Sequence, residues 1–534
     1  MRYAAFAISI ILTIVFVILT LVFSNWWLIG VAIAGLLALV GTYDICQTKH
    51  SITRSVPILA HLRFLMEFIS PEMRQYFLET NTSGRPFNRD QRSLVYERSK
   101  NIEGLKPFGT EIDVYSDEYE WIMHSIAPTK KSEKPFRTLV GGEQCKKPYS
   151  CSLLNISSMS FGAISPNAIM AMNQGAKKAG FAHWTGEGGF SPYHQRYGGD
   201  IVWQIGTGYF GCRNDDGTFN SDLFAEQAVE DQIKMVEIKI SQGAKPGHGG
   251  VLPAAKITHE IAQTRKIPMG EDCLSPPAHS AFQTPIELCH YVQHLRDLSG
   301  GKPVGFKLCI GMPHEFLAIC KAMLETGILP DFINVDGGEG GTGAAPPEFS
   351  NSMGAPLIEG LVFVHNSLIG CGLRDKIKVA CAGKVSSAAH IVRNLAIGAD
   401  WCLAARGFML AVGCIQAQKC HTNTCPVGVA TQQPGRYQAL NVPDKAERVF
   451  RFHSNTLEAF NELLAAMGLE HPDELCPHHV SKRIEPNKVQ TYQAAYKFLE
   501  SNVLVNGTCH HPILAKAWAA AAADTFRPNH QPQT

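Results

Sequence analysis

The hydrophobic pattern separates a strongly apolar N-terminal segment from a long region of short alternating elements. Residues 3–23 and 26–43 carry no charged side chain. Each stretch approaches or reaches the roughly 20 apolar residues that cross a bilayer as a helix. Trp26 and Trp27 lie between them, and indole rings favour the membrane interface. The pattern predicts a transmembrane helical hairpin over residues 1–48.

Charges at the ends of this hairpin predict its orientation. Arg2 precedes the first apolar stretch, Lys49, His50 and Arg54 follow the second, and the connecting turn is uncharged. The positive-inside rule then places both ends in the cytoplasm. A cleaved secretory signal is the alternative, but the second apolar stretch argues against it. We expect the inner (cytoplasmic) membrane, with the catalytic domain facing the cytoplasm.

From about residue 150, short β-rich runs alternate with helical stretches. Such runs cover residues 304–308 and 332–336, and helical periodicity covers 314–326 and 387–398. Strands that alternate with helices favour parallel pairing. About eight units in this region would fit a (β/α)8 barrel, here expected over residues 146–412. A doubly wound open sheet is the alternative fold.

The segments before and after the barrel have their own expected structures. Residues 49–145 form a mixed segment expected to pack on it, residues 413–485 hold a cysteine-rich loop and following helices, and residues 486–534 form a helical tail. The net charge of +1 over 534 residues argues against a nucleic-acid partner. Most of the 16 cysteines are scattered singly, which indicates free thiols in a reducing compartment rather than a disulfide framework.

Three cysteines are the exception to this scatter. Cys414, Cys420 and Cys425 fall close together, and Pro426 follows the last. Short irregular loops of this kind bring thiolates together around an iron–sulfur cluster, and three ligands suit a three-iron cluster. Zinc with a fourth ligand such as His421 is the competing metal. Three unrelated buried thiols are the alternative without a metal.

Polar and glycine-rich groups follow several predicted strands. Residues 336–343 form a glycine cluster directly after one strand, where the backbone could approach a flat ring or a phosphate closely. It lacks the spacing of a dinucleotide fingerprint, and a loop that merely turns is the simpler explanation. Lys239 and Lys307 stand inside β-like runs, where a buried lysine needs an anion unless it faces solvent. In a barrel these groups converge on the C-terminal face.

Two loops near the end of the barrel suit a phosphate. Gly383-Lys384 and Arg406-Gly407 follow consecutive late strands, and the loops after the seventh and eighth barrel strands commonly hold a phosphate. We predict Lys307, Lys239 and Glu187 as catalytic residues. The residues predicted to bind a cofactor with a flat ring and a phosphate are Ser158, Met159, Ser160, Gln242, Lys245, Lys307, Asp336, Gly337, Gly338, Gly341, Thr342, Gly343, Gly383, Lys384, Arg406 and Gly407.

These motifs together resemble the synthase core of the glutamate synthase large subunit. The resemblance is carried in order by residues 158–165, 186–189, 239–247, 340–343 and the loop from Gly413 to Gln432. It implies a (β/α)8 barrel, FMN, and a [3Fe-4S] cluster on Cys414, Cys420 and Cys425. It also implies formation of glutamate from 2-oxoglutarate and ammonia.

Three segments depart from the family pattern, and one of them is Cys309 to Pro313, where the usual Ser-Glu-Val-Gly pattern is missing. The chain reads Gly338-Glu339-Gly-Gly-Thr-Gly where the family usually has His-Asp-Gly-Gly-Thr-Gly, and His248 stands where a glutamate commonly follows Lys-Pro-Gly. No glutaminase domain is recognised, so free ammonia is the expected nitrogen source.

The resemblance therefore predicts an oxidoreductase that aminates 2-oxoglutarate or a related 2-oxo acid. Its expected partners are that substrate or an amino acid, a redox partner such as ferredoxin, quinone or a membrane protein, and, as an option, further copies of itself. A membrane-linked amine or acid dehydrogenase that feeds quinone would use the same parts. A non-catalytic flavin protein and a zinc-containing barrel without flavin are further alternatives.

Overall fold

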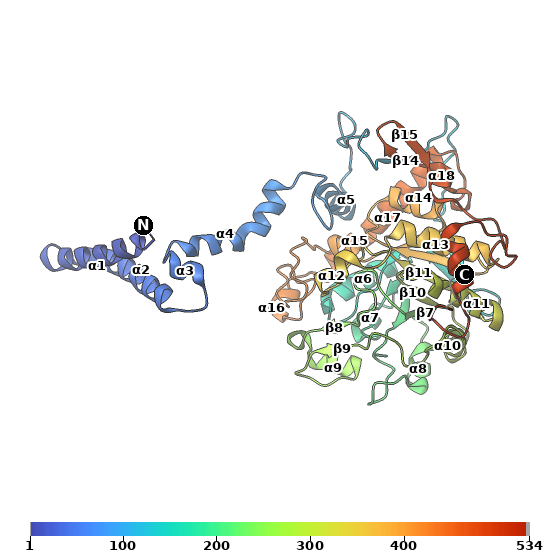
Figure 1. Ribbon diagram of the computed structural model, residues 1–534, viewed down its shortest axis with the longest axis horizontal. Helices are drawn as coiled ribbons and strands as arrows, with labels where there is room; N and C mark the ends of the chain where they lie inside the picture. Colours follow the sequence, from blue (N-terminus) through green and yellow to red (C-terminus); the bar gives the residue numbers. More distant parts are fainter. Residues whose placement is uncertain (1, 530–534) are drawn as a thin grey trace. The chain divides into compact units, whose positions relative to one another are not determined.

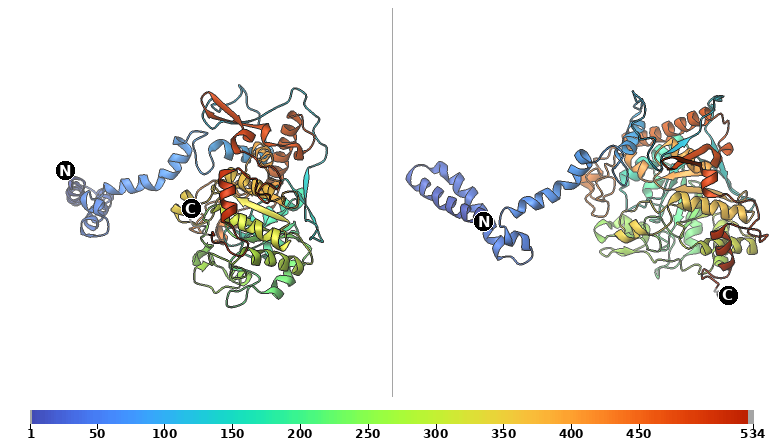
Figure 2. Two further views of the ribbon diagram at one scale, coloured as in Figure 1. Left: turned by 45° about the vertical axis from the view of Figure 1, so that its right-hand side comes forward. Right: turned by 45° about the horizontal axis from the view of Figure 1, so that its top comes forward.

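The computed structural model describes residues 2–529, and the chain divides at residue 90 into two compact units. In the first unit, α1 (Ala4–Val22) and α2 (Leu28–Cys46) lie side by side, joined by a turn of 3-10 helix at Asn25–Trp27 (Figure 2). Phe16 stacks on Trp27 with ring centroids 5.7 Å apart. Both helices are long and apolar enough to cross a membrane, judged by length and composition alone.

Short helices follow the hairpin within the same unit. They are α3 (Ser51–Ser55), α4 (Ala60–Met73) and a π-helical turn at Arg74–Leu78. Asp44 near the end of α2 is buried, and it accepts hydrogen bonds from the Ile58 backbone and the His61 ring. These bonds fix the chain reversal that follows α2.

The second unit is built on a closed barrel of eight parallel strands (Figure 1). The barrel confirms the predicted fold and excludes the open sheet. Its strands, in order around the barrel, are β4 (Leu154–Ile156), β5 (His183–Trp184), β6 (Ile201–Ile205), β7 (Ile233–Lys239), β10 (Val304–Leu308), β11 (Phe332–Asp336), β12 (Lys378–Ala382) and β13 (Trp401–Ala404).

These strands form because they are apolar on both faces. Parallel strands covered by helices are buried on both sides and therefore read as nearly continuous hydrophobic runs. β10 and β11 are buried at every position. One core cluster includes Trp184, Met235, Phe332 and Trp401, contributed by four different strands.

Helices connect the barrel strands, and further helices precede the first strand and follow the last. Capping residues set their starts: Ser165 caps α6, and Thr284 with Glu287 forms a capping box on α10. From residue 89 on, the helices of eight or more residues are α5 (Arg89–Lys100), α6 (Pro166–Ala179), α8 (Ser221–Ala228), α10 (Pro285–Leu298), α11 (Pro313–Thr326), α13 (Leu357–Gly370), α14 (Ala388–Ala396), α17 (Val442–Ala466) and α19 (Pro512–Ala520). The shorter helices are α7 (Pro192–Gln195), α9 (His259–Arg265), α12 (Pro347–Ser352), α15 (Arg406–Ala411), α16 (Pro434–Tyr437) and α18 (Tyr492–Tyr496).

Three small antiparallel sheets surround the barrel. β1 (Glu120–Ile122), β14 (Val480–Glu485) and β15 (Lys488–Thr491) form the first. β2 (Arg137–Val140) pairs with β3 (Tyr149–Ser152), and β8 (Val251–Leu252) with β9 (Cys273–Leu274). We expected only helices beyond the cysteine loop, whereas β14 and β15 are strands. β14 pairs with β1, far away in the sequence, so its local pattern could not reveal its partner.

Candidate active site at the C-terminal end of the barrel

A layer of polar side chains lies within the otherwise apolar barrel strands. Gln204 pairs in register with Glu237, and Lys307 lies opposite both Lys239 and Asn334 on neighbouring strands. Side chains of a strand alternate between its two faces, so Glu237 and Lys239 share one face. All five residues are almost entirely buried. Burial of so many polar groups requires that each find partners.

Lys307 finds its partner in Asp336. The Lys307 ammonium lies 3.2 Å from an Asp336 carboxylate oxygen, and the same oxygen accepts a hydrogen bond from the backbone of Gly243. Burial alone would lower the pKa of Lys307, but the Asp336 and Glu237 carboxylates more than offset it and raise the pKa. Lys307 is therefore a permanent buried cation next to the glycine cluster.

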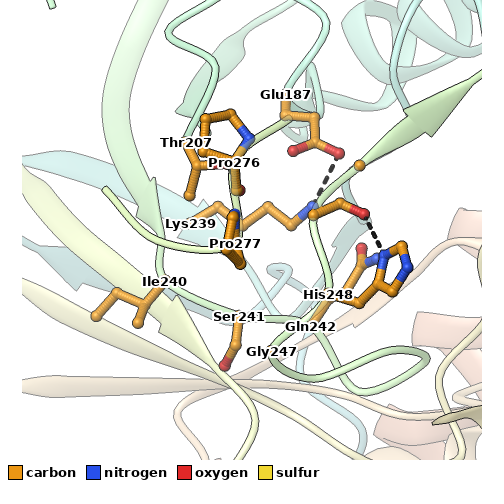
Figure 3. Close-up of a pocket in the computed structure, with 12 residues that line it drawn as sticks. Glu187, Thr207, Lys239, Ile240, Ser241, Gln242, Gly247, His248, Pro276 and Pro277 are labelled. Carbon is orange, nitrogen blue, oxygen red and sulfur yellow. Dashed lines mark hydrogen bonds and ion pairs between the residues drawn. The ribbon is translucent and has the colours of Figure 1, made fainter. Parts of the chain in front are cut away.

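Lys239 and Glu187 form a second ion pair at the end of β7. Their charged atoms lie 2.9 Å apart, and Figure 3 shows the Lys239 ammonium pointing to Glu187 while Ile240 points away. Burial would raise the pKa of Glu187, but the charges of Lys239, Arg265 and Lys245 outweigh it and lower the pKa. Glu187 is thus held ionised, and it keeps Lys239 oriented.

A pocket opens beside this ion pair. Its lining includes Glu187, Lys239, Gln242, His248 and the Pro276-Pro277 segment, most of which Figure 3 shows around one space. His248, which departs from the family pattern, lines this pocket, and its ring lies 2.9 Å from the carbonyl oxygen of Gly249. The site therefore offers a cation, a carboxylate and an imidazole to a small ligand.

Glu237 ties several strands together beneath this pocket. Its carboxylate accepts hydrogen bonds from Trp184 at 3.1 Å, from Gln204 at 2.5 Å and from Asn334 at 2.8 Å. Gln204 also donates to the hydroxyl of Ser158 at 2.7 Å. Burial raises the pKa of Glu237, partly opposed by the charge of Lys307. This network links the turn after β4 to the two lysines.

The predicted glycine cluster packs tightly on its neighbours. A Cβ on Gly243 would lie 1.7 Å from the carbonyl oxygen of Gly337, so the loops after β7 and β11 touch backbone to backbone. Gly341, Thr342 and Gly343 are exposed at the end of the cluster. Arg406 donates to the carbonyl oxygen of Glu339 at 2.7 Å, which joins the loop after β13 to this cluster.

The other predicted cofactor residues follow barrel strands as expected. Ser158, Met159 and Ser160 follow β4, Gln242 and Lys245 follow β7, and Gly383-Lys384 and Arg406-Gly407 follow the seventh and eighth barrel strands. Lys384 adopts a positive φ of 50°. Burial lowers the pKa of Lys245, which interacts with Glu187 and Lys239. The predicted residues thus gather at the C-terminal ends of the strands.

The three predicted metal ligands lie in one loop but do not converge on one point. Within residues 2–529, no set of three His, Cys, Asp or Glu side chains is arranged to hold a metal ion. Burial raises the pKa of Cys414 to about 12, and the nearby Cys420 and Cys425 thiols contribute to the rise. The thiols therefore lie within electrostatic range of one another, and the iron–sulfur site stays a prediction.

Several residues of the site were missed by sequence reasoning. Glu237, Gln204 and Asn334 are polar residues at buried positions of otherwise largely apolar strands, which is the signal that could have identified them. Lys256 was also missed. Its ammonium donates to the carbonyl oxygens of Ala163 at 2.7 Å and Cys420 at 3.2 Å. Nothing in its local sequence marks that position.

The fold and site define a (β/α)8 barrel with a buried cationic site, and the comparisons name its family. Residues 120–470 match the family model described as the conserved region in glutamate synthase. The chain is 34% identical over 485 residues to the glutamate synthase large subunit-like protein YerD of Bacillus subtilis, covering 83% of this chain and 92% of that protein. The chain therefore belongs to the glutamate synthase family and is an oxidoreductase of the kind that acts on CH-NH2 donors.

The chain is also similar to an archaeal enzyme over part of its length and to a solved structure at low sequence identity. The chain is 36% identical over 315 residues to the archaeal glutamate synthase (NADPH) of Archaeoglobus fulgidus, and the match covers 59% of this chain but only 58% of that enzyme. A double mutant of flavocytochrome b2 with pyruvate bound is 13% identical, with a TM-score of 0.41 over 85% of this chain and 92% of that structure.

The chemistry of the site fits FMN, the flavin of this family. FMN carries a phosphate, and its reduced ring is an anion, so it requires cations and close backbone approach. Lys307 and Lys245 are buried cations at the strand ends, Arg406 lies against the glycine cluster, and the contact of Gly243 with Gly337 leaves no room for a side chain. These groups would hold the ring and the phosphate.

Proposed function

We propose that this protein is an FMN- and iron–sulfur-dependent oxidoreductase that aminates 2-oxoglutarate, or a related 2-oxo acid, with free ammonia to give glutamate. The observation that carries the proposal is the buried cation Lys307, held beside Asp336 at the edge of the glycine cluster. A buried cation of this kind suits an anionic ring and a dicarboxylate substrate. Family membership supports the reaction class.

The residues of the pocket have distinct roles in this proposal. Lys239 presents N–H donors to a substrate carboxylate, and Glu187 holds that ammonium in place. Lys307 supplies a fixed positive charge where negative charge accumulates on the ring. Pro276 and Pro277 line the pocket and restrict the access of water. Bound FMN would supply hydride transfer to the C=N bond of an imino acid.

Electron flow in the opposite direction gives a second candidate function. In that case the protein would be an amine or acid dehydrogenase that passes electrons to membrane quinone. The observation that favours it is the helical hairpin, whose two helices meet the length and composition of membrane spans. We propose that this hairpin anchors the protein in the inner membrane with the barrel in the cytoplasm. A variant lacking residues 2–48 should then leave the membrane fraction, and retention there would contradict the anchor.

The cofactors can be tested on the full-length protein purified in detergent without oxygen. The proposal expects flavin absorption bands that reductant bleaches, iron and sulfide in the protein, and an EPR signal from a three-iron cluster. A protein free of both flavin and iron would contradict it. Zinc in place of iron would retain the fold and remove the proposed electron path.

A further inference from the structure

One face of helix α4 (Ala60–Met73) is a stripe of apolar side chains. The spacing i, i+3, i+4, i+7 and i+11 places five residues in one line along the helix, and we call them the apolar stripe: Leu62, Leu65, Met66, Ile69 and Met73. All but Ile69 are exposed, with exposed fractions between 44% and 58%. Water-facing surfaces rarely carry a continuous apolar patch of this kind, so the stripe calls for a partner.

The other faces of α4 differ from this stripe. Glu67 and Ser70 lie on a polar face together with Arg63, which forms an ion pair 2.8 Å long with Glu67. Phe64, on a further side, packs edge-on against the His50 ring with centroids 5.9 Å apart. The turn that follows the hairpin therefore contacts the side of α4 that carries Phe64, and it leaves the apolar stripe exposed.

Contacts with α2 fix where α4 begins. Asp44, in the last turn of α2, accepts the backbone N–H of Ile58 at 2.9 Å and lies 2.8 Å from a ring nitrogen of His61. The Ile58 side chain also lies against α2, because a Cβ on Gly41 would be 3.2 Å from it. Helix α4 thus starts beside the last turns of α2. If α2 crosses a membrane, this is the level at which it leaves the hydrocarbon region.

A lipid bilayer is the partner that fits these features. Interfacial helices lie in the membrane plane with an apolar face among the acyl chains and a charged face toward water. The segment between α2 and α4 contains Lys49, His50 and Arg54, and basic side chains next to a membrane span are attracted to anionic headgroups. The amphipathic pattern, the starting level of α4 and the neighbouring basic residues therefore agree on one partner.

We propose that α4 is an interfacial helix, whose apolar stripe lies at the boundary between headgroups and acyl chains of the cytoplasmic leaflet. The inference rests on the proposed membrane anchor, because it requires the hairpin to cross the same bilayer. It adds a second membrane contact of a different kind, a helix that lies along the surface. A second copy of this chain and the barrel unit are the other partners that a test must distinguish.

The test is site-specific photocrosslinking of the full-length protein in isolated membranes. The photoreactive residue p-benzoylphenylalanine replaces one residue at a time: Leu65 in the apolar stripe, Glu67 on the polar face, or Ile14 in α1. All three side chains are more than half exposed, so each probe can be accommodated. Light joins the benzophenone group to a nearby C–H bond, and mass spectrometry then shows whether lipid or peptide is attached. Ile14 reports the bilayer around the hairpin, and Glu67 is the matched control on α4.

We expect lipid adducts at positions 14 and 65 and their loss at position 67. Wild-type protein in lipid nanodiscs provides a second measurement that needs no substitution. Met66 and Met73 belong to the apolar stripe, whereas Met353 lies in the barrel unit with a similar exposed fraction, 45%. With a water-soluble oxidant, Met66 and Met73 should lose most of the oxidation that Met353 undergoes, because lipid covers them.

Three results would overturn the inference while the anchor stands, each with lipid adducts at position 14. Peptide adducts at position 65 would assign the stripe to a second copy or to the barrel unit. No adduct at position 65, with Met66 and Met73 oxidised as fast as Met353, would leave the stripe in water. Equal lipid adducts at positions 65 and 67 would show that the stripe does not orient the helix. Absence of lipid adducts at position 14 would instead remove the proposed anchor, and this inference with it.

Discussion

Lys307 on β10 and Asp336 at the end of β11 form an ion pair 3.2 Å long within the barrel. The pair lies where the predicted glycine cluster begins, and Asp336 also accepts the backbone N–H of Gly243. One carboxylate thus holds both a buried cation and the loop after β7.

Replacement of Lys307 by Met should reduce turnover about a hundredfold, because it removes a fixed charge from the reaction site. It would also leave the Asp336 carboxylate buried without its partner. The measurement is steady-state kinetics together with the FMN content of the purified variant. Lys302→Met, which removes a buried lysine elsewhere, should retain wild-type kinetics. Equal losses in both variants would contradict a specific role for Lys307.

The close approach of the loops after β7 and β11 predicts that Gly243→Ala is poorly tolerated. The added methyl group would lie 1.7 Å from the carbonyl oxygen of Gly337, so the two loops must separate. We expect a loss of about 1–3 kcal/mol in unfolding free energy and weaker FMN retention. Gly435→Ala is the control, because open space surrounds that position. Normal FMN binding by Gly243→Ala would show that the contact is dispensable.

The hydrogen bonds of Glu237 predict the effect of Glu237→Gln. Both carboxylate oxygens accept from neutral donors, so an amide nitrogen in place of one oxygen would face a donor in the buried layer. The unmade bond should cost about 1–3 kcal/mol of stability. Urea unfolding measures this loss, and Lys234→Gln, at a less buried position of the same strand, is the control. A variant as stable as wild type would mean that the network rearranges.

Buried neutral histidines predict a loss of stability in acid. His453 stacks on Phe181 with ring centroids 4.0 Å apart, and burial lowers its pKa to about 3. In the unfolded chain this histidine takes up a proton near pH 6.5, whereas in the folded protein it does not. Its contribution to the free energy of unfolding is therefore fully present above that pH and is lost as the pH falls below it. His453 alone should account for about 2 kcal/mol between pH 6.5 and 5.

His453→Phe is the variant that isolates this effect, because it keeps an aromatic ring against Phe181 and removes the titrating group. Its unfolding free energy should fall less steeply than that of wild type between pH 6.5 and 5. Parallel pH profiles for the two proteins would show that other groups cause the acid sensitivity.

The barrel was predictable because its longer strands are short apolar runs that end in charged or glycine-rich groups. β10 and β11 show this pattern most clearly. β5 spans only His183–Trp184, too short to produce a pattern of its own, and the closed barrel alone shows that it is a strand. β15 escaped prediction because its pairing is with β14 and not with the core.

The candidate site was predictable where chemistry follows a strand and not where it depends on several strands at once. Lys307, Asp336 and Arg406 were identified from their positions after or within strands. The role of Glu237 depends on its hydrogen bonds with Trp184, Gln204 and Asn334, which come from three other strands. The partners of Lys256 likewise come from distant segments, and only the folded chain brings them together.

The most direct test of the account is the fate of labelled ammonium. Full-length protein purified in detergent is incubated without oxygen with 2-oxoglutarate, [15N]ammonium and a reduced low-potential donor, and glutamate is analysed by mass spectrometry. The account predicts [15N]glutamate that depends on the donor and on Lys307. Absence of labelled glutamate, together with flavin reduction by amino acids or reoxidation by quinone, would contradict glutamate synthesis and favour the dehydrogenase.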